Sequence, residues 1–299
     1  MEQKKKVTVN KKVYIVVLHY KNLEDTLACL ESLRKVTYND YHIVVVDNDS
    51  QDGSYEYLVE HATDCQVIQS GENRGYAAGN NVGIRYALEN QADYVCILNN
   101  DVEVEPDFLT KLVEYMESAS DVGMAGPVVY EFDRRDIVQS AGFSIGIGKG
   151  STQPLMQGKN KSIIQKETVK FCDGLSGTCL LVKREVLEKA GLIPENYFLF
   201  FEEMEWCINV RKQGYKLATV FAVGVYHKGS ATLKKTGTMS RYYMARNRVL
   251  FVRRNGTVFE LIAFLLIEGL GYMIRPLFSS KKDVRKMERD AFLEGLSKQ

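Results

Sequence analysis

The stretch Tyr94-Val95-Cys96-Ile97-Leu98-Asn99-Asn100-Asp101-Val102-Glu103-Val104 decides the fold class. Its first half predicts a buried parallel strand, because such strands are short, β-branched and aliphatic. Two amides and a carboxylate follow at once, and open α/β sheets bind ligands at the carboxyl ends of their strands. Pro106 then stands at a plausible first helical position, before apolar residues at helical spacing. We expect Asp101 at a strand end in a cleft, although turn chemistry alone is the simpler explanation of the triplet.

The preceding residues alternate strand-like and helix-like segments. Short apolar runs predict strands at 13–18, 41–46 and 66–69. Periodic apolar residues predict one helix from Leu23, with Asn22 as its cap, and another through Ile84. Strand and helix at this spacing indicate an α/β fold with a mostly parallel sheet and helices on its faces.

The composition is that of an ordinary globular protein. The chain has 299 residues, 45% of them hydrophobic and 26% charged, which suits one large domain with an appendage. The six cysteines form no Cys-x-x-Cys pair, and we expect them to be reduced and largely buried. The Lys-rich first 12 residues lead into no signal-peptide-like apolar region, so we expect a cytoplasmic protein.

Two polar loops allow two interpretations each. Asp47 follows a strand directly, so its carboxylate could accept from a base N–H or a ribose hydroxyl, or could simply form an Asx turn. Arg74, between Asn73 and Gly75, could approach a phosphate. The commoner explanation of the second loop is a helix entry that requires glycine.

Three carboxylates, Glu202, Glu203 and Glu205, stand directly after an aromatic run. A helix dipole favours acids in the first turn, which accounts for part of this cluster. An apolar surrounding also raises the pKa of a carboxyl group towards the range useful to a general base. Trp206, the single tryptophan, fits either acceptor stacking or the core.

Four motifs follow one another along the chain, at residues 17–22 (VLHYKN), 45–50 (VVDNDS), 73–81 (NRGYAAGNN) and 98–101 (LNND). Together they resemble the inverting family-two glycosyltransferases of the GT-A fold, in the style of bacterial rhamnosyltransferases. The resemblance covers residues 13 to 230. It implies a nucleoside-diphosphate sugar donor that lies across the carboxyl edge of the sheet.

The resemblance also implies roles for single residues. Asp101 takes the metal-ligand position of an Asp-x-Asp motif whose first Asp is here Asn99, and His227 completes that site or contacts the diphosphate. Glu203 takes the position of the base, as Glu in place of Asp. We expect donor contacts from Tyr20, Asp47, Asn48, Arg74, Asn80, Asn99 and Asn100, Mg²⁺ or Mn²⁺ on Asp101 and His227, catalysis by Glu203, and acceptor contacts from Glu202 and Trp206.

The middle of the chain is less regular. Strands are expected at 122–130, 173–182 and 216–223. The glycines of 143–150 suggest a phosphate-binding loop, but Lys149 is followed by Gly150 and not by Ser or Thr. We therefore expect a mobile loop there, running on to residue 168.

The tail from Lys234 carries 14 Lys or Arg against 6 Asp or Glu, a net +8, so the rest of this +1 chain carries −7. Its longest apolar run, 261–267, is too short to span a membrane, which takes about 20 residues. Glu260, Glu268 and Arg275 fall in one helical sector, as in an amphipathic helix on an anionic membrane. Packing on the catalytic domain or on a second subunit is nearly as good an explanation.

These observations predict a GT-A catalytic domain over 1–233 and a basic helical tail over 234–299. The predicted activity is inverting transfer of a sugar, L-rhamnose by resemblance, to a cell-surface or lipid-linked glycan. The expected partners are the donor, that acceptor, an anionic membrane surface and a possible second copy, but no nucleic acid. The expected location is the cytoplasmic side of the cell membrane. The alternative is a catalytically weak nucleotide-sugar-binding or scaffold protein, because Glu203 and Asn99 both depart from the family pattern.

Overall fold

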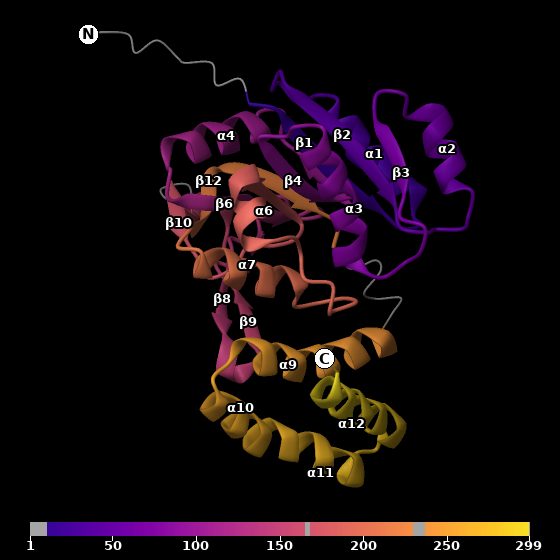
Figure 1. Cartoon of the computed structure of the whole chain (residues 1–299), viewed down its shortest axis with the longest axis vertical. Coiled ribbons are helices and arrows are strands. Elements are labelled where there is room, and N and C mark those ends of the chain that lie inside the picture. Colours follow the sequence, from indigo (N-terminus) through magenta and orange to yellow (C-terminus); the bar gives the residue numbers. More distant parts are fainter. Residues whose placement is uncertain (1–10, 165–167, 230–236, 299) are drawn as a thin grey trace.

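A central sheet occupies the upper part of the molecule, and the C-terminal helices form a layer below it (Figure 1). The structure is a computed structural model that describes residues 11–164, 168–229 and 237–298. The strand order is β10-β12-β6-β11-β4-β1-β2-β3, with β5 beside β12 and β7 beside β6. The strands of this sheet are β1 Val13–His19, β2 Tyr41–Asp47, β3 Gln66–Gln69, β4 Tyr94–Asn99, β5 Val102–Val104, β6 Val122–Glu131, β7 Val138–Ser140, β10 Val169–Phe171, β11 Cys179–Lys183 and β12 Lys216–His227.

The half of the sheet formed by β1 to β4 is parallel, as predicted. β1 pairs with β2 and β4, and β2 pairs with β3, all in parallel. The residues of β4 from Tyr94 to Leu98 are all buried, because apolar cores lie on both faces of the sheet. The carboxyl ends of β1, β2 and β4 therefore meet at one edge, where His19 lies opposite Asp47.

The other half mixes strand directions. β11 runs antiparallel between β4 and β6, whereas β12 is parallel to β6. β5 follows Asp101 directly and pairs antiparallel with the end of β12, so that Val102 lies opposite His227. Three residues are too few for a periodic signal, so the sequence did not predict β5. β11 also begins only at Cys179, because residues 174–178 form a turn and loop.

Helices cover both faces of the sheet. α1 and α4 contribute to the core on one face, and α3, α6 and α7 to the core on the other. The bounds are α1 Leu23–Leu33, α2 Ser54–His61, α3 Tyr76–Glu89, α4 Phe108–Ser118, α5 Lys161–Ile164, α6 Arg184–Ala190 and α7 Glu202–Lys212.

Two predicted helix starts are wrong in detail. Asn22 precedes α1 in a left-handed conformation, and its side chain bonds Asp25 and caps no backbone N–H. α4 begins only at Phe108, because Pro106 lies in the preceding turn.

The mobile loop expected between residues 143 and 168 is also wrong. β8 Phe143–Gly146 and β9 Ser151–Pro154 form an antiparallel hairpin around the short helix η1 Ile147–Lys149. The hairpin is ordered by packing against the tail: Arg248 donates to the carbonyl oxygens of Lys149 and Gly150. The local sequence of residues 143–168 does not reveal that Arg248, about 100 residues further on, holds this hairpin. Residues 165–167 lie outside the described residues.

The tail is a helical layer with a core of its own. It contains α9 Gly237–Asn255, α10 Val258–Phe264, the π-helical turn η2 Leu265–Gly269, α11 Leu270–Phe278 and α12 Lys282–Ser297. Val249 and Val252 of α9 pack with Phe264 and Phe292 in that core. On its other side α9 contributes Leu250 and Phe251 to a cluster with Phe201. Within the described ranges, no helix combines the length and apolarity needed to cross a bilayer.

All six cysteines are free thiols, and Cys29, Cys96, Cys179 and Cys207 are buried as expected.

Candidate active site

Asp101 and His227 come from distant parts of the sequence and meet at the sheet edge. The antiparallel pairing of β5 with β12 brings them side by side. Asp101 Oδ1 lies 3.1 Å from His227 Nε2, and both side chains are partly exposed. The structure thus brings together the two residues that the sequence analysis expected at a metal.

The chemistry of this pair suits a divalent cation. His227 Nδ1 lies 2.9 Å from Oε1 of Gln139, a residue of β7. If Nδ1 donates to this oxygen, the lone pair of Nε2 points towards the Asp101 carboxylate. Two such electron-rich atoms repel each other unless a proton or a cation lies between them. Among the described residues no group of three or more His, Cys, Asp or Glu could hold a metal. Two protein ligands are nevertheless usual where substrate phosphates and waters complete the coordination of Mg²⁺.

Asp47 is fully buried at the end of β2. His19 lies behind it with Nε2 3.9 Å from Asp47 Oδ1, and the same ring contacts Thr26 and Ser54 at 2.7 and 2.8 Å. Burial lowers the pKa of His19 more than the Asp47 carboxylate raises it. The lowered pKa favours a neutral imidazole, which lies beside Asp47 without a hydrogen bond to it and is held by Thr26 and Ser54.

Three buried polar oxygens near this edge have no hydrogen bond from any described residue: Asp47 Oδ1, Asn48 Oδ1 and Asn80 Oδ1. Asn48 is held from its amide side, which donates to Asn73 Oδ1 at 3.1 Å. Asn80 is held likewise by a bond to the Tyr76 carbonyl. Buried acceptors without a donor are costly, and N–H or O–H groups of a ligand would satisfy them.

Two of the other residues expected at the sugar donor, Asn100 and Arg74, have their side chains engaged elsewhere. The Asn100 amide donates to Thr26 Oγ1 at 2.9 Å, and so reinforces the support of His19. The Arg74 guanidinium is exposed and pairs with Glu72 and Glu195 at 3.1 and 3.2 Å. Asn99 is half-buried, with its backbone N–H bonded to the Thr178 carbonyl.

Tyr20, also expected at the donor, is 41% exposed in the loop after β1.

The turn before α7 is strained. Phe200 and Phe201 have φ of 73° and 76°, which bulky side chains rarely adopt, at a cost of about 1–3 kcal/mol each. Asn247 of α9, itself fully buried, donates to the carbonyls of Leu199 and Phe200 at 2.7 and 3.1 Å. The tail therefore holds the conformation in which the acidic residues emerge.

Glu202 and Glu203 are the unpaired acids of this turn. Oε2 of each is buried without a hydrogen bond from any described residue. Burial raises the pKa of Glu203, and burial together with repulsion from Glu203 raises that of Glu202 well above its usual range. A pKa raised by burial moves a carboxyl group towards the range that suits a general base.

Glu205 differs from its two neighbours because other residues neutralise it. Arg254 of α9 donates to both of its oxygens at 2.8–3.1 Å, and Asn255 and Tyr197 donate as well. Burial opposes ionisation of Glu205, but these bonds outweigh it and lower the pKa. Arg254, Asn247 and Asn255 were given no role from the sequence, because packing of the tail on the catalytic domain was one of two open explanations and a local pattern does not show which tail residues meet the acidic turn.

The structure corrects the expected role of Trp206. The expected contact with an acceptor sugar is wrong, because its side chain is fully buried in the core with α3 and α6. Its indole N–H donates to the Gly191 carbonyl at 2.9 Å. Glu202 is also only 3% exposed, so it faces no acceptor in this conformation.

The loop at residues 73–76, which we call the donor loop, contacts the residues that lead into α7 (198–205), which we call the acidic turn. Tyr76 N–H donates to the Phe198 carbonyl at 3.1 Å. Gly75 has φ of 97°, and a Cβ there would lie 2.1 Å from that same oxygen, so only glycine fits. Phe198 in turn stacks on Tyr243 of α9 with ring centroids 4.9 Å apart. Donor loop, acidic turn and tail therefore form one continuous contact.

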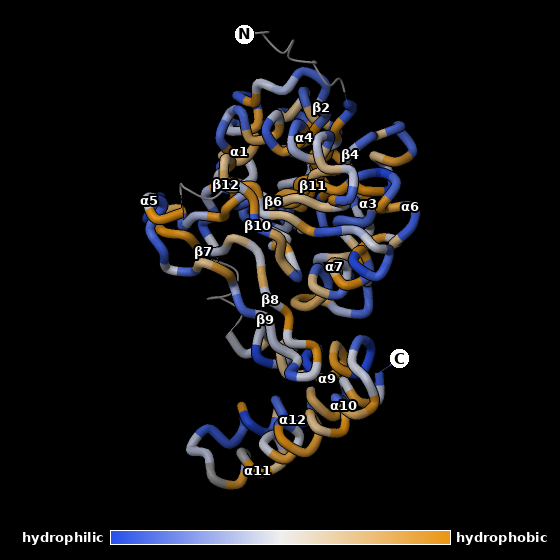
Figure 2. Tube along the Cα trace, turned by 90° about the vertical axis from the view of Figure 1, so that its left-hand side faces the viewer, coloured by the Kyte–Doolittle hydropathy of each residue, from blue (hydrophilic) through white to orange (hydrophobic). Residues whose placement is uncertain are grey.

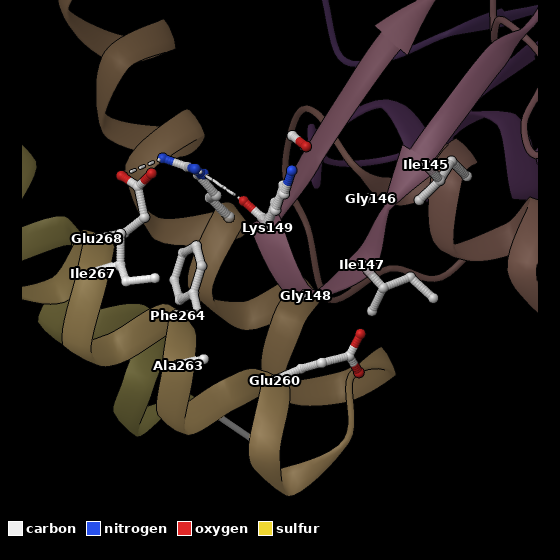
Figure 3. Close-up of a pocket in the computed structure, with 12 residues that line it drawn as sticks. Ile145, Gly146, Ile147, Gly148, Lys149, Glu260, Ala263, Phe264, Ile267 and Glu268 are labelled. Atoms are coloured by element: carbon white, nitrogen blue, oxygen red, sulfur yellow. Dashed lines mark hydrogen bonds and ion pairs between the residues drawn. The ribbon is translucent and has the colours of Figure 1, made fainter.

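A cavity of about 960 Å³ lies apart from these residues, between the β8–β9 hairpin and α10 with η2. Figure 3 shows Ile145 and Ile147 on one wall, with Phe264 and Ile267 on the helix side. Of the residues expected at the site, none lines it.

Comparison with known proteins gives consistent matches. The model for "Glycosyl transferase family 2" matches residues 14–191. The hexosyltransferase Agl10 of low-salt glycan biosynthesis in Haloferax volcanii is 26% identical over 89% of this chain and 85% of its own. The dTDP-rhamnosyl transferase RfbF of Shigella flexneri is 25% identical over 96% of both chains.

A solved structure matches over nearly the whole chain. The mannosyltransferase PcManGT of Pyrobaculum calidifontis, in complex with GDP-Man and Mn²⁺, superimposes with a TM-score of 0.59. The match covers 98% of this chain and 77% of the other at 16% identity, which establishes a likeness of fold.

Proposed function

This chain belongs to glycosyl transferase family 2 and is a glycosyltransferase of the GT-A fold, and we propose that it is a metal-dependent, inverting hexosyltransferase. The proposed donor is a nucleoside-diphosphate sugar, with L-rhamnose as the sugar. Full-length similarity to a dTDP-rhamnosyl transferase supports that sugar. The proposed acceptor is a hydroxyl group of a lipid-linked or cell-surface glycan.

One observation carries the mechanism: Glu203 keeps a buried, unpartnered carboxyl oxygen with a raised pKa, while the nearby Glu205 is neutralised by Arg254. Glu203 takes the proton of the acceptor hydroxyl, and that oxygen attacks the anomeric carbon from the face opposite the diphosphate. A single displacement of this kind inverts the anomeric centre. Asp47, Asn48 and Asn80 supply acceptors for the N–H and O–H groups of the nucleotide.

Asp101 and His227 would hold a divalent cation, Mg²⁺ or Mn²⁺, which neutralises charge on the leaving diphosphate. The partly exposed setting of this pair leaves room for phosphate oxygens and water. The Mn²⁺ bound to PcManGT, a protein of similar fold, is consistent with this proposal.

We place the enzyme at the cytoplasmic face of the membrane, with the basic tail from Lys234 as its contact with anionic lipid. A lipid-linked acceptor has its glycan within reach of such a surface. A homodimer through the tail is the competing arrangement.

The second candidate function is a nucleotide-sugar-binding or scaffold protein with weak catalysis. Glu203 in place of Asp and Asn99 in place of Asp are the observations that favour it.

A donor panel tests both candidates. Thermal unfolding is measured with several nucleoside-diphosphate sugars, each with and without Mn²⁺, since a ligand of the native state raises the melting temperature. Transfer and donor hydrolysis are then assayed with the best binder. Metal-dependent binding with turnover supports the enzyme. Binding without turnover supports the scaffold, and no binding by any donor overturns both.

A further inference from the structure

The outer side of α10, η2 and α11 is apolar and exposed. Phe259 is 84% exposed, Ile267 74% and Leu277 69%. Figure 2 shows the hydrophobic stretch along α10 and α11, at the end of the molecule away from the sheet. The outer apolar face, as we call it, consists of Val258, Phe259, Ile262, Leu266, Ile267, Leu270, Ile274 and Leu277.

The acidic residues of the same helices turn towards the protein. Glu268 pairs with Arg248 of α9 at 3.0 Å. Glu260 closes a capping box with Thr257, and a Cβ on Gly148 of the hairpin would lie 2.8 Å from its Cγ. An ordinary surface helix shows the opposite arrangement, with polar residues towards water and apolar ones towards the core. Eight large apolar side chains exposed on one run of helix indicate a binding surface.

The charge beside this face selects the partner. Lys281, Lys282 and Lys286 are exposed where α11 passes into α12, and the tail carries +8 overall. In a symmetric dimer through this face, each tail would meet a second tail of the same positive charge. An anionic bilayer offers apolar chains to the helices and phosphate groups to the lysines.

We propose that the outer apolar face enters the interface of an anionic lipid bilayer, with Lys281, Lys282 and Lys286 at the lipid phosphates. The helices lie parallel to the membrane plane, as amphipathic helices of this kind do. The inference rests on the proposed function and deepens it, because it names the surface that brings the acidic turn to a lipid-linked acceptor. α9 joins the two, since it packs against both the acidic turn and the tail core.

Flotation of the full-length protein with vesicles tests the inference. Mixed phosphatidylcholine and phosphatidylglycerol vesicles should bind the protein, more weakly as salt rises but without complete loss, because burial of apolar surface resists salt. Phe259→Ser with Leu266→Ser should lower binding about 100-fold, since burial of each large side chain contributes about tenfold. Lys281→Gln with Lys282→Gln should lower binding to these vesicles about 25-fold, at about fivefold for each lysine charge lost.

The matched control exchanges exposed apolar residues elsewhere, Val59→Ser with Phe171→Ser, and should bind vesicles like the unaltered protein. Vesicle binding by the Phe259/Leu266 variant at the unaltered level overturns the inference. So does a dimer, seen by light scattering, that this variant splits. Equal binding to pure phosphatidylcholine and no effect of the lysine changes also contradict it.

Donor binding is followed by thermal shift in every variant. If a variant loses vesicle binding and keeps donor binding, the change affects membrane binding only. If every form fails to bind the sugar donor, the proposed function is rejected, and the membrane inference is judged by the vesicle data.

Discussion

The sheet edge after β4 and the first turn of α7 both present carboxyl groups, but these groups differ in their exposure to solvent and in their partners. At the sheet edge, Asp101 faces His227 in a partly open setting. In the first turn of α7, Glu202 is buried and Glu203 is half-buried, and each keeps one buried oxygen without a hydrogen bond from a described residue. Two sets of carboxyl groups whose surroundings differ in this way are suited to different tasks, the first to a cation and the second to a proton.

A third setting completes the comparison. Glu205 lies in the same turn as Glu203, yet Arg254 and Asn255 neutralise it. Its charge is therefore structural. The position of a glutamate within the helix does not decide its role. The difference arises because Arg254 and Asn255 of α9 bond Glu205 and not Glu203.

The largest expected effect concerns the proton. Glu203→Gln should lower sugar transfer by about 10²–10⁴-fold, the usual contribution of a positioned general base, while donor binding persists. Steady-state kinetics and donor thermal shifts measure the two quantities. Glu202→Gln is the matched control and should retain more activity. If the Glu202 variant loses transfer and the Glu203 variant keeps it, the two neighbours have exchanged roles.

Next is the cation. Asp101→Asn should weaken Mn²⁺-dependent donor binding about 100-fold, because loss of a direct ligand costs at least what loss of a supporting residue costs. Calorimetric titration with and without Mn²⁺ measures this, and Asp107→Asn, a change at a half-exposed residue of the turn before α4, serves as control. Tight, Mn²⁺-dependent binding in the Asp101 variant is incompatible with the proposed site.

The structural carboxylate comes third. Arg254→Met should lower the free energy of unfolding by about 2 kcal/mol at pH 7, because it leaves Glu205 buried and unpaired. The value is below that for a fully buried pair, since Arg254 is a third exposed. The lowered pKa of Glu205 means that the pair stabilises above the unfolded carboxyl pKa and that this stability is lost as pH falls through the folded value.

Urea unfolding at pH 7 and at low pH measures this difference, which should shrink in acid. Arg289→Met removes an exposed contact with Asp290 and is the control. A deficit for Arg254→Met that is unchanged in acid would assign the effect to packing.

The smallest effect is the pH slope of stability. A raised folded pKa means that Glu203 adds stability below the unfolded carboxyl pKa, which is lost as pH rises through the folded value. Glu203→Gln should remove the contribution of Glu203 to this slope, at most about 1.4 kcal/mol per pH unit for one proton, and so stabilise the protein at pH 8 relative to pH 5, while the buried Glu202 keeps its own contribution. Urea midpoints across that range measure it, and an unchanged slope would contradict a raised pKa at Glu203.

Much of the β1–β4 edge, where we propose that the sugar donor binds, was predictable from the sequence. Strands 13–18, 41–46 and 66–69 were predicted correctly, because a buried parallel strand is a local apolar run. The polar residue that ends such a run lies at the sheet edge whatever the rest of the chain does. Asp47 and Asp101 could therefore be placed at one edge without any knowledge of their partners.

The predictions from sequence were wrong where the structure of a segment or the burial of a side chain depends on residues distant in the sequence. The β8–β9 hairpin is ordered by Arg248, and Trp206 is buried against α3 and α6, two helices that precede it in the sequence. The division into residues 1–233 and 234–299 stays a prediction, and α9 lies against the acidic turn all the same.

By itself the sequence determined the α/β class, the order of the motifs and the edge at which their polar residues gather, because each depends on spacing within one segment. Only the tertiary structure decided which two of the three glutamates keep an unpaired oxygen, which one is paired with Arg254, and which side of the tail stays exposed. The physical reason is that the charge state and burial of a side chain depend on what packs against it. For Glu205 and Phe259 alike, those neighbours are set by the folded arrangement of distant segments.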